Sequence, residues 1–142
     1  MTTVSPHRPA RRARHRPAQV LLETVLTLTG AGAVVGGLLL AVRPDGSLLA
    51  ADPQVLRGTP FDSWRAPGLL LTTLVGAGFL GTAAALHLGH RHARRLAIAA
   101  GLGLVAFEAA EFGWLGFQPL ELVFAAVGGL VAVLATGSEG SS

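Results

Sequence analysis

The stretch that decides the fold is residues 20–42, VLLETVLTLTGAGAVVGGLLLAV, in which Glu23 is the one charged residue. A helix of about 23 residues rises about 1.5 Å per residue and can therefore cross a hydrocarbon core about 30 Å thick. The apolar segment of a secretory signal is shorter. We therefore interpret residues 20–42 as an uncleaved first transmembrane helix.

Three further apolar runs follow, at residues 68–88, 96–115 and 119–136. They are about 21, 20 and 18 residues long, and each matches the length of a spanning helix. Inside lipid a segment must satisfy its own backbone hydrogen bonds, which favours helices. The alternative, a barrel, needs at least about eight short segments of alternating polarity, and these runs do not alternate. The sequence predicts an all-α fold, a four-helix transmembrane bundle formed by residues 19–136.

The amino-acid composition also indicates that much of the chain is surrounded by lipid. Of the 142 residues, 51% are hydrophobic and 13% are charged, and the mean hydropathy is +0.55. Soluble domains carry about 25% charged residues, so this chain has too few to cover a water-facing surface. The length allows one domain, and the hydrophobic content excludes a disordered chain. With no cysteine, a disulfide scaffold and cysteine-ligated metal sites are also excluded.

The segments between and beyond these runs are polar. Residues 1–18 form an Arg- and Pro-rich arm, which we expect to be disordered because like charges repel and proline interrupts helices. Residues 43–67 read as a mixed-charge loop and residues 89–95 as a short basic loop. Residues 137–142 read as a flexible tail.

Arginine placement predicts the orientation, because positively charged loops stay in the cytoplasm. With four spans and a cytoplasmic N-terminus, the outer side holds Arg43, Arg57 and Arg65, and both termini are cytoplasmic. Trp64 and Trp114 then fall at the outer interface, where indole rings prefer to lie. All basic residues are arginine, which suggests a GC-rich bacterial genome. With four predicted spans, we then expect a multi-pass protein of the bacterial inner membrane. The inner side holds eight arginines: Arg8, Arg11, Arg12, Arg14, Arg16, Arg91, Arg94 and Arg95.

Each run gathers its small and polar residues on one face, so we expect the four faces to meet in the centre of the bundle. Gly32 and Gly36 have GxxxG spacing on the opposite side of the first run, and could seat a second copy of the chain. Ordinary crowding in a glycine-rich chain is the alternative interpretation. The inward faces include Gly30 and Gly37 of the first run, Thr72 and Gly76 of the second, Gly101 of the third and Gly128 of the fourth.

The acids of the last two runs are the sharpest candidates for a site. Glu108 and Glu111 lie one turn apart on one face, and Glu108 is about 18 Å from the inner end of its run. With Glu121 they could line a polar cavity that opens outward and binds a cation, a proton or a polar ligand. Alternatively, Glu108 packs against a neighbouring helix and Glu111 reaches the interface. Glu121 could then simply complement the dipole of its helix.

Polar residues at the inner end have simpler interpretations. We expect Glu23 to pair with an arginine of the arm. His87 and His90 have the i, i+3 spacing of a metal-binding face, but no acid or cysteine stands near them. We interpret these two residues and His92 as members of a basic loop, and we expect no metal and no cofactor.

No nucleotide-binding loop, nucleophile elbow, zinc-protease or calcium-loop pattern is present in the sequence. Asp45 and Asp52 read as turn and capping residues. The chain is therefore not expected to be an enzyme and has no predicted catalytic residue. We expect it to contact the lipid bilayer and no nucleic acid. Anionic headgroups would contact Arg8, Arg11, Arg12, Arg14 and Arg16 of the arm.

One segment resembles a known group of proteins. Residues 56–71, LRGTPFDSWRAPGLLL, followed by Gly76 and residues 83–85, resemble an uncharacterised family of small bacterial four-helix integral membrane proteins. In that family a TPF…PG-Leu-Leu segment leads into the second span. The turn at residues 117–120, FQPL, is also similar to theirs. The resemblance implies a four-span topology and no activity.

Two classes of function are consistent with these features. The first is a structural or interaction protein, an accessory subunit whose spans pack against a second copy or another membrane protein. The second is a proton-coupled or cation-binding protein, for transport or ligand binding, that uses the acids of the third and fourth runs.

Overall fold

The computed structural model describes residues 16–115 and 119–137, and within these ranges it is helical and contains no strand. This confirms the all-α prediction. The first half of the fold consists of α1 (Arg16–Val42) and of one rod. In the rod, α2 (Arg65–Leu70), π-helix η3 (Leu71–Ala77) and α3 (Gly78–His87) follow one another without a break. The second half consists of α4 (Ala93–Leu115) and α5 (Pro119–Thr136).

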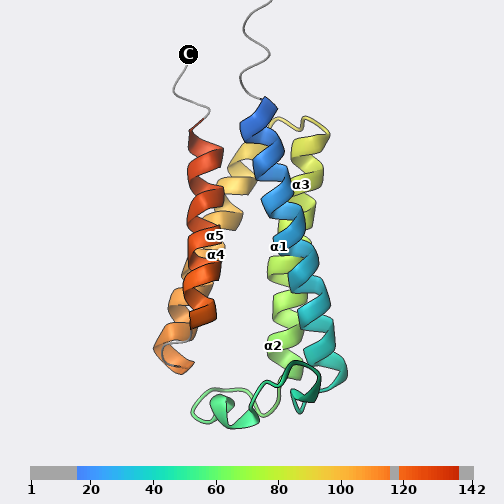
Figure 1. Cartoon of the computed structure of the whole chain (residues 1–142), viewed down its shortest axis with the longest axis vertical. Coiled ribbons are helices and arrows are strands. Elements are labelled where there is room, and N and C mark those ends of the chain that lie inside the picture. The colour runs from blue at the N-terminus through green and yellow to red at the C-terminus, as the bar shows by residue number, and fades with distance from the viewer. Residues whose placement is uncertain (1–15, 116–118, 138–142) are drawn as a thin grey trace, which may run out of the picture.

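The helices are arranged as two hairpins (Figure 1). One consists of α1 and the rod α2–η3–α3, and the other consists of α4 and α5. The start of α1, the end of α5 and residues 88–92 lie at one end of the molecule, and the 43–64 loop lies at the other. Contacts of α3 with α4 and of α1 with α5 join the hairpins.

Small residues bring α1 close to the rod. A Cβ on Gly37 would collide with the Thr72 hydroxyl and the Gly68 carbonyl oxygen, and a Cβ on Gly30 would lie 3.1 Å from the Gly76 carbonyl oxygen. Because glycine has no side chain, two helix backbones can touch at these positions, which is a common way for helices to associate in lipid. Gly101 and Gly128 play the same part between α4 and α5. The small faces thus meet in pairs, one pair in each hairpin, and do not all converge on one centre.

Threonine hydroxyls in the rod are satisfied within their own helix. Thr72 donates to the Gly68 carbonyl oxygen at 2.9 Å, and Thr82 donates to the Gly78 carbonyl oxygen at 2.7 Å. Bonds of this kind let a hydroxyl lie in apolar surroundings without an orphaned donor. Thr82 is accordingly buried.

Three helix starts differ from the predicted boundaries. The rod begins at Arg65, inside the predicted 43–67 loop, because Pro67 is permitted in the first turn of a helix. Residues 16–18, expected in the disordered arm, form the first turn of α1, where Pro17 is tolerated because that position needs no N–H donor. Arg94 and Arg95, expected in a loop, lie in the first turn of α4 because Leu96 N–H already bonds the His92 carbonyl at 3.0 Å. Residues 1–15 and 138–142 lie outside the described residues.

The loop between α3 and α4 is short because α3 ends in a tight glycine cap. Gly89 has φ +67°, a conformation that costs glycine little. Its N–H bonds the Leu86 carbonyl at 3.0 Å, and the next N–H, of His90, bonds the Ala85 carbonyl at 2.9 Å. This pair of bonds is a Schellman motif, which satisfies the last carbonyls of the helix and reverses the chain.

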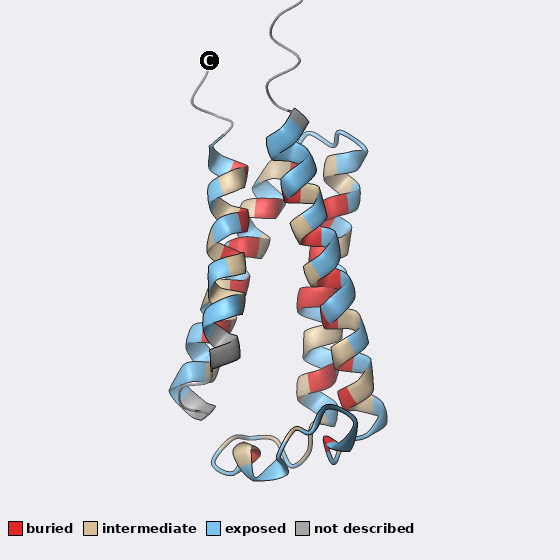
Figure 2. Ribbon diagram, in the orientation of Figure 1, coloured by how far each residue is buried: buried red, intermediate tan, exposed pale blue. Residues whose placement is uncertain are grey.

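In the part of the chain that the structure describes, three helices are long and apolar enough to cross a membrane: Pro17–Val42, Arg65–His87 and Ala93–Gly113. The described part of α5, Leu122–Thr136, is a shorter apolar helix. Buried residues lie where helices face one another (Figure 2). The outward sides carry large apolar residues that are more than half exposed, among them Val35, Leu74, Leu102 and Val133. Such a surface is that of a membrane protein.

Candidate functional site: a cleft between the hairpins

The main candidate site is a cleft of about 590 Å³ between the two hairpins, towards the 43–64 loop. α1, the rod and the loop form one side, and α4 with Phe124 of α5 forms the other. The cleft exists because the small faces hold each hairpin together separately. Most of its walls are apolar, including Ala33, Leu40, Val75, Leu104 and Phe107.

Glu108 and Glu111 both line this cleft from α4. Glu108 is buried, with 6% of its surface exposed, and Glu111 is half-buried. Their i, i+3 spacing on a continuous helix directs both side chains to the same side. The structure thus places this predicted pair of acids together on the wall of one cleft.

Gly32 and Gly36 form the opposite wall, on α1. A Cβ built on either residue meets no described atom within 4 Å, so none of the described helices covers this GxxxG face. The other three candidate packing glycines, Gly76, Gly101 and Gly128, lie against neighbouring helices. The uncovered glycines therefore face the acids across the cleft, a relationship that no local sequence pattern encodes.

Trp64, expected at the outer interface, lines the cleft as well. Its backbone N–H donates to the Pro44 carbonyl oxygen at 3.0 Å. At Gly46, φ is +75°, and a Cβ there would lie 2.9 Å from Cδ1 of Trp64. The indole Nε1 is buried and has no hydrogen-bond partner in the described part of the chain. Because Pro44 and Gly46 contact Trp64, the turn predicted at residues 44–46 is the sequence signal that could have indicated the position of this tryptophan.

The third predicted acid, Glu121, belongs to the first turn of α5, but its side chain lies outside the described residues. The side chain of Trp114 does too. The candidate site consists, for these reasons, of Glu108 and Glu111 facing Gly32 and Gly36.

The loop acids are structural, as predicted. Asp45 accepts hydrogen bonds from the Ser47 hydroxyl at 2.8 Å and the Ser47 backbone N–H at 3.1 Å. These bonds, the hydroxyl bond first, hold the pKa of Asp45 below its ordinary value because they stabilise the carboxylate. Asp52 caps the short helix η2 (Pro53–Leu56) by accepting from the Gln54 N–H at 2.8 Å.

Polar residues near the other end form a separate, local set. Glu23 accepts a hydrogen bond from Gln19 Nε2 at 2.7 Å, and its second oxygen lies 3.5 Å from Nδ1 of His87. Its observed neighbours are thus on α1 and α3, whereas the arm arginines expected to pair with it lie outside the described side chains. The His90 and His92 rings are 5.8 Å apart. No group of three potential ligands that could hold a metal occurs within residues 16–115 and 119–137.

Comparison with protein-family models, with curated proteins and with solved structures finds no match to this chain. The resemblance to small four-helix membrane proteins therefore stays a prediction from residues 56–71. Function has to be argued from the cleft itself.

Proposed function

We propose that this chain is a multi-pass protein of the bacterial inner membrane with four spans and both termini in the cytoplasm. Three apolar helices of spanning length support the membrane assignment, and α5 supplies the fourth span. The start of α1 and the end of α5 lie at the same end of the molecule, as an even number of spans requires. The arginine bias, eight against three, favours the cytoplasm for that end.

We further propose that the cleft binds an organic cation with an apolar body. The observation that carries this function is the burial of the Glu108 carboxylate in a cleft whose walls are mostly apolar. A carboxylate at membrane depth is stabilised by a nearby positive charge or by a proton. An apolar cation supplies the charge and also fills the apolar walls.

The size and composition of the cleft suit such a ligand. Its volume of about 590 Å³ falls within the range of about 300–1,000 Å³ that is typical of small-molecule sites. Gly32 and Gly36 leave room opposite the acids, and Trp64 adds an aromatic ring, whose face attracts cations.

Tetraphenylphosphonium, an apolar cation, tests this function by calorimetric titration into the full chain in detergent. We expect saturable binding that weakens at least about tenfold in the Glu108→Gln variant, because one charge–charge attraction is lost. The Glu23→Gln variant, changed at the opposite end, should bind like the unaltered protein. Equal binding by the Glu108→Gln variant would refute the proposal, and so would an absence of binding by the unaltered protein.

The second candidate is an accessory subunit, and it is favoured by the uncovered Gly32 and Gly36. A GxxxG face without a neighbour is suited to a helix of a second copy or of another membrane protein. Under this proposal Gly36→Leu dissociates an assembly that light scattering detects in mild detergent. A monomeric unaltered protein would speak against the self-association form of this candidate. We assign the protein no enzymatic activity.

A further inference from the structure

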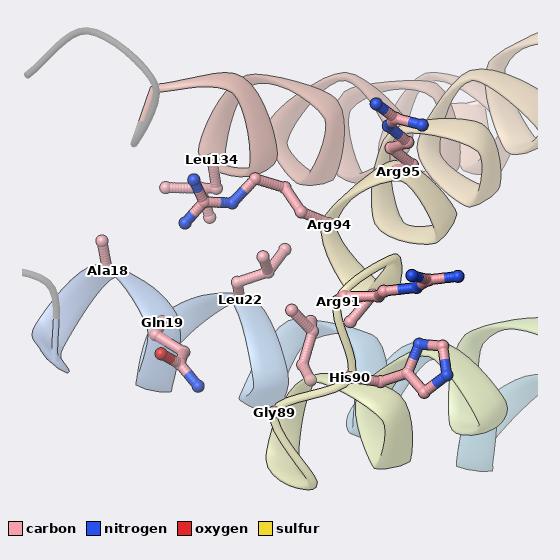
Figure 3. A pocket seen from close by; sticks show the side chains of 11 residues that line it. Ala18, Gln19, Leu22, Gly89, His90, Arg91, Arg94, Arg95 and Leu134 are labelled. Carbon is pink, nitrogen blue, oxygen red and sulfur yellow. The ribbon is translucent and has the colours of Figure 1, made fainter. Parts of the chain in front are cut away.

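A second cavity, of about 460 Å³, lies at the end of the molecule that holds the start of α1 and the end of α5 (Figure 3). It is bounded by the first turns of α1, by the end of α3 with residues 89–91, by the start of α4 and by Leu134 of α5. α1, the rod, α4 and α5 thus all contribute to one cavity. It is separate from the cleft that holds Glu108, since the two share no lining residue.

One side of this cavity is strongly basic. Arg91, Arg94 and Arg95 line it together with His90, and none of the described lining residues is acidic. Arg94 is half-buried, whereas Arg91 and Arg95 are exposed. Figure 3 shows the Arg94 side chain reaching from α4 towards Leu134. The side chains of Arg91 and Arg95 extend away from that of Arg94 in the same view, so the guanidinium of Arg94 is the positive group placed in the cavity, where it favours an anion.

The other side of the cavity is apolar. Leu22 of α1, Leu86 of α3 and Leu134 of α5 line it, with Ala18 near the start of α1. Leu22 is buried, while Leu86 and Leu134 are half-buried. A ligand that fits this cavity combines a negative group with an apolar one.

We propose that this cavity binds the phosphate group of an anionic phospholipid, with the start of the acyl chains against the three leucines. Guanidinium groups bind phosphate oxygens through paired, charge-assisted hydrogen bonds, and Arg94 is the residue placed to do so inside the cavity. The cavity also lies where the apolar parts of the four long helices end. In a chain that spans a bilayer, this is the level of the phosphate groups. The inference rests on the proposed membrane location and orientation of the chain.

The cavity differs from a run of arginines in having an apolar side, which is formed by described residues. An arm of arginines attracts any anionic surface and does not select a ligand by its shape. The cavity adds selectivity for an amphiphile, because an inorganic phosphate ion leaves the leucine side unfilled.

The test uses the full chain in neutral detergent and native mass spectrometry, with dioctanoyl phosphatidylglycerol, dioctanoyl phosphatidylcholine and inorganic phosphate as separate probes. We expect one phosphatidylglycerol to bind saturably, with phosphatidylcholine and inorganic phosphate at least about tenfold weaker. Arg94→Gln should weaken phosphatidylglycerol binding at least about tenfold. The matched control, Arg57→Gln in the loop at the other end, should leave it unchanged.

Three results would each overturn the proposal: equal binding of phosphatidylcholine, inorganic phosphate binding as tightly as the lipid, or no effect of Arg94→Gln. A circular dichroism spectrum matching that of the unaltered protein shows that the variant is folded. Failure of this site is distinguishable from failure of the cleft. Glu108→Gln should leave lipid binding unchanged, and Arg94→Gln should leave tetraphenylphosphonium binding unchanged.

Discussion

Gly101 of α4 and Gly128 of α5 meet backbone to backbone. A Cβ on Gly101 would lie 2.6 Å from the Gly128 carbonyl oxygen, and a Cβ on Gly128 would lie 2.7 Å from the Gly101 carbonyl oxygen. The contact is reciprocal, so each glycine makes room for the other. This closeness holds the second hairpin together, and the adjoining face of α4, which carries Phe107 and Glu111, lines the cleft.

Replacing Gly101 by alanine should therefore destabilise the fold, because its methyl group would overlap a backbone oxygen that cannot move alone. We expect a loss of about 1–3 kcal/mol, the usual range for overpacking. Thermal unfolding in detergent, followed by circular dichroism, measures it. Gly103→Ala is the control on the same helix, since a Cβ there meets nothing within 4 Å. Equal unfolding midpoints for the two variants would contradict the packing.

Gly36 and Gly37 form an equally sharp pair within α1. Gly37 faces Thr72 and Gly68, while Gly36 faces the open cleft. Gly37→Ala should lower the unfolding free energy by about 1–3 kcal/mol because the rod has to move away. Gly36→Ala should leave stability unchanged or raise it slightly, since alanine favours a helix over glycine. A reversed order of the two variants in the same unfolding assay would show that the assigned faces are exchanged.

Asp45 should titrate below an ordinary aspartate. Hydrogen bonds from Ser47 lower its folded pKa, so the stability it contributes is present above the unfolded pKa of about 3.9 and is lost as the pH falls through the folded value. An NMR titration of the Asp45 carboxyl carbon measures this midpoint. In the Ser47→Ala variant the midpoint should rise towards the ordinary value. A midpoint that does not move would mean that the Ser47 hydroxyl is not the main cause.

The contact between Glu23 and His87 should matter little for stability. Nδ1 and Oε2 are 3.5 Å apart, and the His87 side chain is 81% exposed. Exposed pairs of this kind contribute about 0–1 kcal/mol. His87→Ala should therefore leave the unfolding midpoint in detergent within about four degrees of the unaltered protein. A drop as large as that of Gly101→Ala would show that the contact has a structural role that its exposure does not suggest.

The helices of this fold could be predicted from sequence because hydropathy and length alone define them. α5 spans residues 119–136, as predicted, and α1 and α4 end at the predicted Val42 and Leu115. The starts shift by three or four residues because arginine and proline are permitted in a first helical turn, although neither is apolar.

The pairing of helix faces could not be predicted in the same way. Periodicity tells which side of a helix carries Gly101 or Gly37, but any small face can pack against any other. The cleft results from the pairing of helices within each hairpin. That Glu108 faces Gly32 and Gly36 across it therefore depends on tertiary structure. The basic cavity around Arg94 was missed for the same reason: its leucines come from α1, α3 and α5.

The most direct test of the central claim, a membrane-spanning chain with its arginine-rich end in the cytoplasm, is cysteine labelling in intact bacteria. The sequence has no cysteine, so single substitutions give an unambiguous signal. A membrane-impermeant maleimide should label the Gln54→Cys variant in intact cells and the His92→Cys variant only after permeabilisation. Labelling of the His92→Cys variant in intact cells, or recovery of the unaltered protein in the soluble fraction, would contradict the account.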